Sequence, residues 1–173
     1  MEQFRNYSAL TLEFQPGVNV LYGANGTGKT NIMESVYLCT CASSHRTSRD
    51  KELIRQGETA YRVRQTFEDD NGKTAQLDIH YLEAVAGDPL RAKNQRVIRH
   101  NGIRLERIGH MMGLFNAVIF APEDMRLIKD GPQARRRFLD LLISQTRPLY
   151  FMKLQQYNLI LNQRNRFLKQ LRE

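Results

Sequence analysis

Residues 23–30 place the strongest constraint on what this chain can fold into. They match the pattern G-x-x-x-x-G-K-[ST] at every fixed position and consist of Gly23, Ala24, Asn25, Gly26, Thr27, Gly28, Lys29 and Thr30. The apolar, β-branched run 17–22 before them predicts a buried strand, and residues 31–38 after them carry apolar side chains at helical spacing. A strand, a glycine-rich loop and a helix in this order predict a phosphate-binding loop rather than a glycine-rich turn of similar sequence.

This arrangement also predicts how the loop binds a nucleotide. Glycines let the backbone N–H groups turn inward and approach phosphate closely, and the N-terminus of the following helix adds partial positive charge at the same place. Lys29 is expected to reach the terminal phosphates, and the Thr30 hydroxyl is expected to bind Mg²⁺.

The composition of the whole chain is that of a soluble globular protein with an anionic partner. Its 173 residues suffice for a real core, and no apolar run is long enough to cross a membrane. The N-terminus does not resemble a signal peptide, and Cys39 and Cys41 are two residues apart on a predicted helix, so we expect buried thiols and a cytoplasmic protein. A formal charge of +8 favours a nucleotide and a nucleic acid as partners.

Hydrophobic patterning predicts an α/β fold with a layer of antiparallel hairpins. The expected strands are 8–14, 17–22, 61–67, 74–81, 94–100, 103–105 and 116–120, with short helices at 50–55 and from Pro122 through Leu127 and Ile128. We expect the first two strands to be antiparallel neighbours. The turns Asp69–Gly72 and Asn101–Gly102 predict two hairpins. A P-loop helix followed by hairpins argues against a mainly parallel sheet and favours lobe I of an ABC-type ATPase head.

The chain changes character after residue 130, so we predict two regions, 1–130 and 131–173. Residues 132–144 read as one helix, and the Arg147-Pro148 pair marks a break. Beyond it an apolar stripe at heptad spacing runs through Leu154, Tyr157, Leu161, Arg164, Leu168 and Leu171. This stripe fits either the start of a coiled-coil-like arm or a helix packed on its own domain.

Several blocks of the sequence resemble the SMC group of ATPases, and within it the RecF family of bacterial recombinational-repair proteins. The blocks are residues 4–7, 16–31, 44–55, 118–125 and 135–140. The resemblance covers nearly the whole chain, and these blocks in this order are far more specific than the P-loop alone.

The resemblance implies an ATP-dependent DNA-binding protein of recombinational repair, replication restart and the SOS response. ATP and Mg²⁺ are the implied cofactors. The implied partners are DNA at gaps or single-strand/double-strand junctions, RecO and RecR, and a second copy in an ATP-dependent head-to-head homodimer. Such proteins help to load recombinase on single-stranded DNA.

The chain also departs from the family pattern. RecF-like proteins are about twice as long, and their signature motif, Walker B strand and switch histidine lie in a second half not found here. We therefore expect an N-terminal fragment that does not hydrolyse ATP, whereas the full-length protein is expected to be a weak DNA-dependent ATPase. Glu123 and Asp124 follow Pro122 and are interpreted as a helix opening at the place of the Q-loop, where no glutamine stands.

The resemblance adds further candidate site residues. Arg5 and Asn6 are expected near the adenine, Asn31 directly after the loop, and Arg46, with His45, near phosphate or DNA. An exposed strand start and a solvated loop arginine are the alternatives. A basic region comprising Arg91, Lys93, Arg96, Arg99, Arg104 and Arg107 fits either DNA contact or a solvated face.

Two functions therefore remain open at this point. The first is the nucleotide-binding half of an ATPase head that serves DNA repair. The second is a stand-alone P-loop module that binds nucleotide without hydrolysing it.

Overall fold

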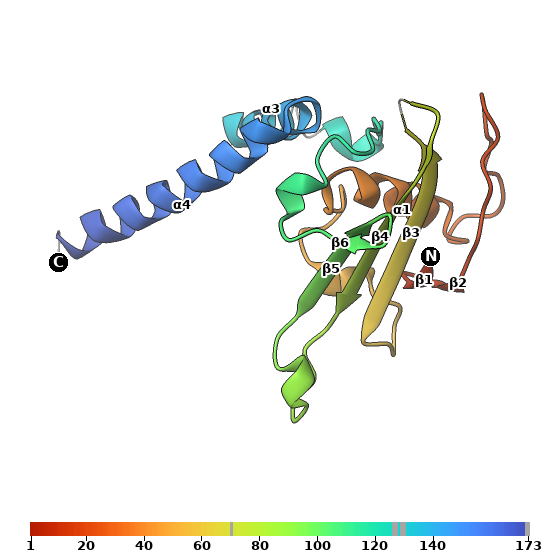
Figure 1. Cartoon of the computed structure of the whole chain (residues 1–173), viewed down its shortest axis with the longest axis horizontal. Helices are drawn as coiled ribbons and strands as arrows, with labels where there is room; N and C mark the ends of the chain where they lie inside the picture. Colours follow the sequence, from red (N-terminus) through yellow and green to blue (C-terminus); the bar gives the residue numbers. More distant parts are fainter. Residues whose placement is uncertain (70, 126–127, 129–130, 172–173) are drawn as a thin grey trace. The chain divides into compact units, whose positions relative to one another are not determined.

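A computed structural model describes residues 1–69, 71–125, 128 and 131–171 (Figure 1). The chain divides into two compact units, 1–119 and 120–173, and each is described by itself. The boundary that the sequence predicts after residue 130 falls inside the second unit and stays a prediction.

The first unit is built on an antiparallel sheet. In the described residues its order is β2-β1-β3-β4-β5-β6. The strands are β1 (Glu2–Phe4), β2 (Tyr7–Ala9), β3 (Ala60–Glu68), β4 (Thr74–Leu82), β5 (Gln95–His100) and β6 (Ile103–Arg104). The sequence therefore predicted the antiparallel character of the sheet correctly.

Both predicted hairpins are confirmed. The Asp69 carboxylate accepts hydrogen bonds from the backbone N–H groups of Asn71 and Lys73, each at 2.9 Å, and so shapes the β3–β4 turn. Asn101 and Gly102 adopt φ of +51° and +81° between β5 and β6, the left-handed conformation that a tight hairpin turn needs.

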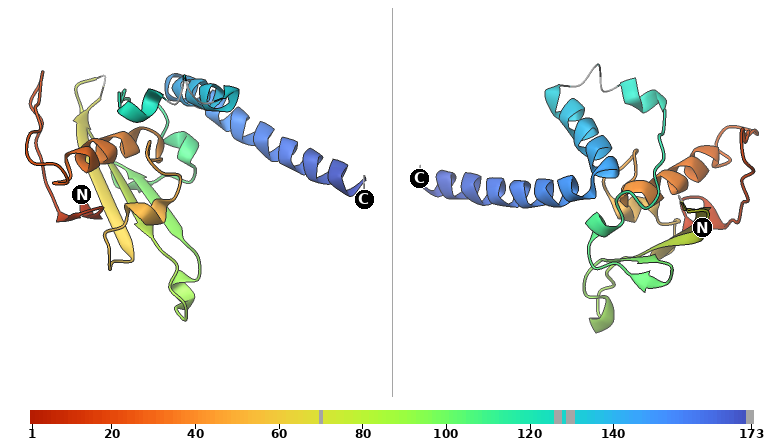
Figure 2. Two further views of the ribbon diagram at one scale, coloured as in Figure 1. Left: turned by 180° about the vertical axis from the view of Figure 1, so that it is seen from behind. Right: turned by 45° about the horizontal axis from the view of Figure 1, so that its top comes forward.

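The core lies between the sheet and helix α1 (Lys29–Cys41), which covers one face of the strands (Figure 2, left). Alternate residues of the central strands β3 and β4 are buried on this face, and the whole core cluster comprises Phe4, Leu38, Cys39, Ala42, Leu53, Tyr61, Val63, Leu77, Ile79, Tyr81, Ile98 and Met111. Cys39 and Cys41 are buried free thiols, as predicted. The opposite face of the sheet is not covered by α1.

Three predicted strands are wrong or too long. Residues 17–22 and 116–120 form no strand, and Val18, Tyr22, Val118 and Phe120 are each at least 91% exposed. Of residues 8–14, only the first two lie in a strand, and that strand pairs with β1, which the sequence did not predict. Apolar alternation predicts a strand only where a neighbouring strand supplies hydrogen-bond partners, and no described segment supplies backbone partners to residues 17–22 and 116–120.

Short 3₁₀ helices connect the longer elements. They are η1 (Asp50–Leu53), η2 (Pro89–Arg91), η3 (Ile108–His110) and η4 (Pro122–Met125). The helix predicted from Pro122 is thus a 3₁₀ turn as far as Met125, Leu127 lies outside the described residues, and Ile128 is helical. The Asp124 carboxylate accepts a hydrogen bond from the Ala121 N–H at 2.7 Å, which fits the interpretation of this segment as a helix opening.

Among the described residues of the second unit, α3 (Pro132–Thr146) and α4 (Pro148–Gln170) are long helices, with the predicted break between them at Arg147. The Tyr150 hydroxyl donates to the Asp140 carboxylate at 2.6 Å and ties the helices together near the break. No described residue of α4 is buried, and its exposed apolar side chains include Leu149, Tyr157, Leu159, Ile160, Phe167 and Leu168. Neither helix, as described, is long and apolar enough to cross a membrane.

Candidate nucleotide-binding site

The loop 23–28 has the backbone that its glycines predict. Gly23, Gly26 and Gly28 have φ of +144°, +83° and +101°, where residues with a Cβ are strained. Gly28 also leaves no room for a side chain, because a Cβ there would lie 2.7 Å from the Asn6 amide and the Tyr7 hydroxyl. The loop leads directly into α1, so the backbone N–H groups of its first turn open toward the loop.

Lys29 lies across this loop. Its ammonium donates to the carbonyl oxygens of Gly23 at 2.8 Å and Ala24 at 2.7 Å, and the Thr27 hydroxyl donates to the same Ala24 oxygen at 3.0 Å. An ammonium has three donors, so Lys29 keeps one for a phosphate oxygen while it holds the loop closed. Thr30 is exposed in the first turn of α1, and its hydroxyl fits one ligand position of a Mg²⁺ ion that keeps waters and phosphate oxygens as its other ligands.

The β1–β2 connection is hydrogen-bonded to the loop. The Asn6 amide and the Tyr7 hydroxyl both donate to the Thr27 carbonyl at 3.1 Å. The Asn31 amide donates to the Asn6 side-chain oxygen at 2.8 Å. Asn6 and Asn31, both predicted from the family resemblance, therefore lie side by side at the loop.

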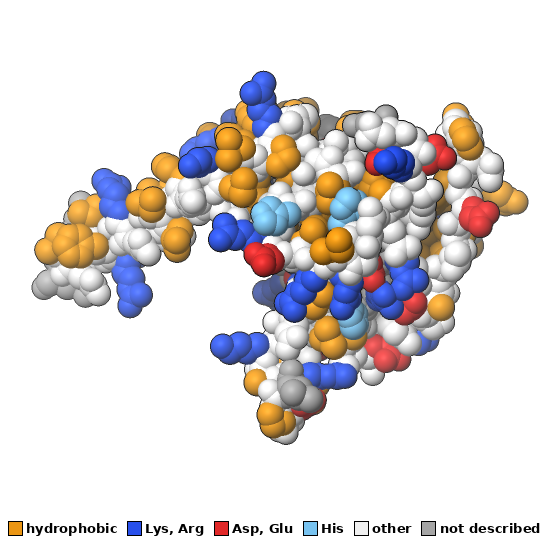
Figure 3. Space-filling model, in the orientation of Figure 1, with side chains coloured by type: hydrophobic (Ala, Val, Ile, Leu, Met, Phe, Trp, Pro, Cys, Tyr) orange, Lys and Arg blue, Asp and Glu red, His pale blue; other side chains and the backbone are white. Residues whose placement is uncertain are grey.

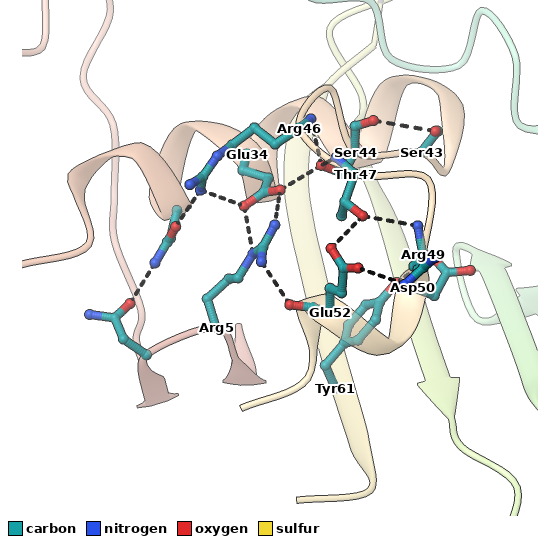
Figure 4. A network of polar contacts seen from close by, with 12 residues as sticks. Arg5, Glu34, Ser43, Ser44, Arg46, Thr47, Arg49, Asp50, Glu52 and Tyr61 are labelled. Carbon is teal, nitrogen blue, oxygen red and sulfur yellow. Dashed lines mark hydrogen bonds and ion pairs between the residues drawn. The ribbon is translucent and has the colours of Figure 1, made fainter. Parts of the chain in front are cut away.

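Glu34 is the centre of a network that the sequence did not predict (Figure 4). This fully buried carboxylate of α1 accepts from Arg5 Nε at 2.9 Å and Arg5 Nη2 at 2.7 Å. It also accepts from Ser44 Oγ at 2.5 Å and from Arg46 Nη1 at 3.3 Å. The sequence offers no signal for this role, because an acid inside an amphipathic helix looks like a solvated side chain.

The charge of Glu34 is stabilised by its partners. Burial by itself raises the pKa of this carboxyl, but the hydrogen bonds from Arg5 and Ser44 and the charges of Arg5 and Arg46 outweigh it, so the pKa lies below its ordinary value. Glu34 is therefore ionised at neutral pH and holds two guanidinium groups beside the P-loop helix.

Arg46 connects this network to the loop by a second route. Its Nη1 also donates to the Asn31 side-chain oxygen at 2.9 Å, and Asn31 donates to Asn6, which donates to the loop carbonyl of Thr27. The Ser44 hydroxyl accepts the backbone N–H of Arg46 at 2.9 Å and so fixes the start of the loop that carries it. The His45 ring lies edge-on to Tyr37 on α1.

Arg5, Asn6, Asn31 and Arg46 border an open pocket of about 610 Å³. It is lined by Arg5, Asn6, Asn31, Arg46, Glu52, Ile54, Arg55 and Gln56. The three guanidinium groups of Arg5, Arg46 and Arg55 outnumber the two carboxylates of Glu52 and the buried Glu34, and Ile54 adds an apolar wall. The sequence predicted Arg5, Asn6, Asn31 and Arg46 as site residues but not Ile54, Arg55 and Gln56, although residues 44–55 form one of the blocks that resemble the family.

The structure distributes the predicted basic region over different surfaces. Arg96 points to the core side of the sheet, where it forms an ion pair with Asp50 and donates to the Ala42 carbonyl at 2.7 Å. Arg91 lies near Asp88 and donates to Thr59 Oγ1 at 3.3 Å. Lys93 and Arg107 are exposed in connecting segments. Arg99 and Arg104 are paired residues of β5 and β6.

Within the part of the chain that the structure describes, no group of three or more His, Cys, Asp or Glu residues is placed to hold a metal ion. Glu34 is engaged by Arg5 and Arg46, so Thr30 is the described side chain that best fits a Mg²⁺ ligand at the loop. A magnesium ion there depends on phosphate oxygens and water for its remaining ligands.

Comparison with known proteins agrees with this geometry. A family model for the AAA domain matches residues 1–173. The DNA replication and repair proteins RecF of Acetivibrio thermocellus and Halalkalibacterium halodurans are 42% and 43% identical to it over 171 residues, which is 99% of this chain and 44% and 43% of theirs. The chain thus spans less than half the length of these relatives.

A solved structure shows the same relationship in three dimensions. The structure described as the recombination mediator protein RecF-ATP in the RecFOR pathway superimposes with a TM-score of 0.89 at 36% identity, over 99% of this chain and 44% of that one. The predicted P-loop head of RecF type, with its antiparallel layer, is thereby confirmed. The chain belongs to the AAA domain family, and the resemblance to RecF that its sequence predicts is confirmed along nearly its full length.

Proposed function

We propose that this chain is the ATP-binding part of a RecF-like DNA replication and repair protein. The observation that carries the proposal is the closed glycine loop 23–28 at the start of α1, with Lys29 across it and the basic pocket beside it. The names of the RecF relatives and of the ATP-bound RecF structure support it.

In this proposal the two parts of the site bind different parts of the nucleotide. The loop residues Gly23, Ala24, Asn25, Gly26, Thr27, Gly28, Lys29 and Thr30 hold the phosphates and a Mg²⁺ ion. The pocket beside Arg5, Asn6, Asn31 and Arg46 receives the ribose and the adenine, with Ile54 as an apolar contact for the base. Magnesium supplies charge neutralisation at the phosphates when it is bound.

The activity and partners of the whole protein are proposals as well. We expect a cytoplasmic protein that binds DNA at gaps or junctions, acts with RecO and RecR, dimerises head to head on ATP and has weak DNA-dependent ATPase activity. The formal charge of +8 and the RecFOR context of the solved relative support this function. The alternative, a stand-alone module that never hydrolyses ATP, is not favoured, because the relatives are named as replication and repair proteins.

The test is titration calorimetry of Mg-ATP into the purified chain. Lys29→Ala removes a charged phosphate contact, and we expect at least about a tenfold loss of affinity with an unchanged fold. Lys73→Ala removes an exposed lysine in the β3–β4 turn and serves as the matched control. Equal ATP affinity in parent and Lys29→Ala would overturn the assignment.

A further inference from the structure

The strand register places three arginines in one row across the face of the sheet that points away from α1. Arg64 of β3 is opposite Asp78 of β4, Asp78 is opposite Arg99 of β5, and Arg99 is opposite Arg104 of β6. Residues that face each other across a ladder share a face. We call Arg64, Arg99 and Arg104 the arginine row. The basic region predicted from the sequence included Arg99 and Arg104, but it also included Arg96, which points to the core side of the sheet. It did not include Arg64.

The positive charge of the row is not cancelled by the carboxylate inside it. Asp78 is buried and binds the Arg62 guanidinium through two hydrogen bonds, at 2.8 and 2.5 Å. The hydrogen bond from Arg62 is the main reason that the pKa of Asp78 is lowered, so this carboxylate stays ionised and engaged. In the described part of the chain, no carboxylate lies within 4 Å of the guanidinium groups of the arginine row.

Figure 3 views this face and shows Lys and Arg side chains in a band over the strands. Arg64 and Arg104 are exposed and Arg99 is half-buried. Neighbouring strands are about 4.8 Å apart, so the row extends over about 14 Å from β3 to β6. One strand of B-DNA presents a phosphate about every 3.4 Å along the helix axis, so a row of this length faces several phosphates of one strand.

The rest of the face indicates which nucleic acid fits. Its outward positions on β3 to β6, apart from Asp78 and the arginines, are Ala60, Thr66, Glu68, Thr74, Gln76, His80, Leu82, Gln95 and Val97. None of these is Phe, Tyr or Trp, so this part of the described face offers no aromatic platform on which unpaired bases can stack. A row of guanidinium groups across a sheet instead suits the outside of a duplex, whose exposed groups are phosphates.

We propose that the arginine row is a docking surface for the phosphate backbone of duplex DNA, laid across strands β3 to β6. This proposal rests on the DNA-binding function proposed above and assigns it to Arg64, Arg99 and Arg104, and not to Arg96. Contacts of this kind position the protein on DNA without reading its sequence.

The experiment compares duplex binding by three variants of the purified chain. The row variant is Arg64→Gln/Arg99→Gln/Arg104→Gln, and the charge-retaining variant is Arg64→Lys/Arg99→Lys/Arg104→Lys. The control variant Arg91→Gln/Lys93→Gln/Arg107→Gln removes the same charge outside the row. A labelled duplex of about 30 base pairs is titrated at several salt concentrations between about 50 and 200 mM.

We expect the row variant to bind the duplex more than about tenfold more weakly, and the slope of log affinity against log salt to flatten by about 2 to 3 units. The charge-retaining variant should keep the parental slope, and the control should bind more tightly than the row variant. Unchanged melting temperatures would show that all variants are folded. An unaltered salt slope in the row variant, or an equal loss in the control, overturns the proposal.

Two further measurements identify the partner of this face. If the row variant loses binding to poly-glutamate but not to the duplex, the partner is an acidic protein and the DNA assignment is wrong. If the parent binds Mg-ATP but not the duplex, the proposal for the arginine row is wrong and the proposal for nucleotide binding is unaffected. If Lys29→Ala leaves the ATP affinity unchanged, the proposed nucleotide site is wrong, and the proposal for the arginine row is unaffected.

Discussion

Glu34 and Arg5 join the P-loop helix to the first hairpin through two hydrogen bonds of 2.9 and 2.7 Å. The carboxylate is fully buried, whereas the guanidinium also donates to the Glu52 carbonyl at 2.7 Å near the surface. Because Arg46 approaches the same carboxylate, the two arginines beside the loop take their positions from one acid. The pocket proposed for the nucleotide therefore depends on a side chain that does not line it.

Glu34→Gln should destabilise the chain by about 1.5–3 kcal/mol, because it replaces charge-assisted hydrogen bonds to Arg5 by weaker neutral ones. Urea unfolding of parent and variant measures the difference. Glu52→Gln is the control, since Glu52 is an exposed acid on the same pocket, and its effect should stay within about 0.5 kcal/mol. Equal losses in the two variants would show that Glu34 has no special role.

Acid should weaken the same network. The pKa of Glu34 in the folded chain lies below its ordinary value of 4.5, so the carboxylate contributes its full stability above pH 4.5. This contribution is lost as the pH falls through the lowered pKa. The free energy of unfolding should therefore drop more steeply below about pH 4.5 in the parent than in Glu34→Gln. Parallel pH profiles for the two proteins would contradict this.

Gly28→Ala should be more damaging to stability than Gly26→Ala. Both glycines have positive φ, so each substitution strains the backbone by about 1–3 kcal/mol. Only at Gly28 would the new Cβ lie 2.7 Å from Asn6 and Tyr7, which hold the Thr27 carbonyl. Thermal unfolding of the nucleotide-free chains measures the difference, and similar losses would show that the close approach of Asn6 and Tyr7 is unimportant.

The hairpins and the loop could be predicted from sequence because their signals are local. Asp69–Gly72, Asn101–Gly102 and the glycines of residues 23–28 determine backbone conformation within a few residues. The apolar runs 17–22 and 116–120 have the pattern of strands, but strand formation depends on backbone partners, which a sequence pattern does not reveal. Glu34 could not be placed for a similar reason, since only folding brings it to Arg5.

This chain should not turn over ATP. Lys29 and Thr30 can hold phosphate and Mg²⁺, but Glu34 is engaged by Arg5 and Arg46 and is not available to orient a water. Each missing catalytic group of this kind typically lowers the rate by about 10²–10³. Phosphate release should equal that of Lys29→Ala under the same conditions. Steady hydrolysis that Lys29→Ala abolishes would mean that another carboxylate, such as Asp124 or Glu123, completes the site.

Helix α4 should be the least protected long element in hydrogen exchange. It has no buried residue among those described, whereas Leu77 and Ile79 of β4 are fully inaccessible. Amides of residues 154–168 should therefore exchange much faster than those of β4. Comparable protection of α4 and β4 in a monomeric sample would show that the apolar stripe of α4 has found a partner surface.

The exposed runs 17–22 and 116–120 also affect how the chain behaves in solution. An extended, β-branched segment whose backbone groups lack partners is a template on which a second molecule can add a strand. Val18, Val20, Val118 and Phe120 are exposed. A higher protein concentration therefore offers these runs the backbone partners that no described residue of the same molecule supplies. Concentration is therefore a thermodynamic variable for this chain, and its apparent stability should be compared only at one low value.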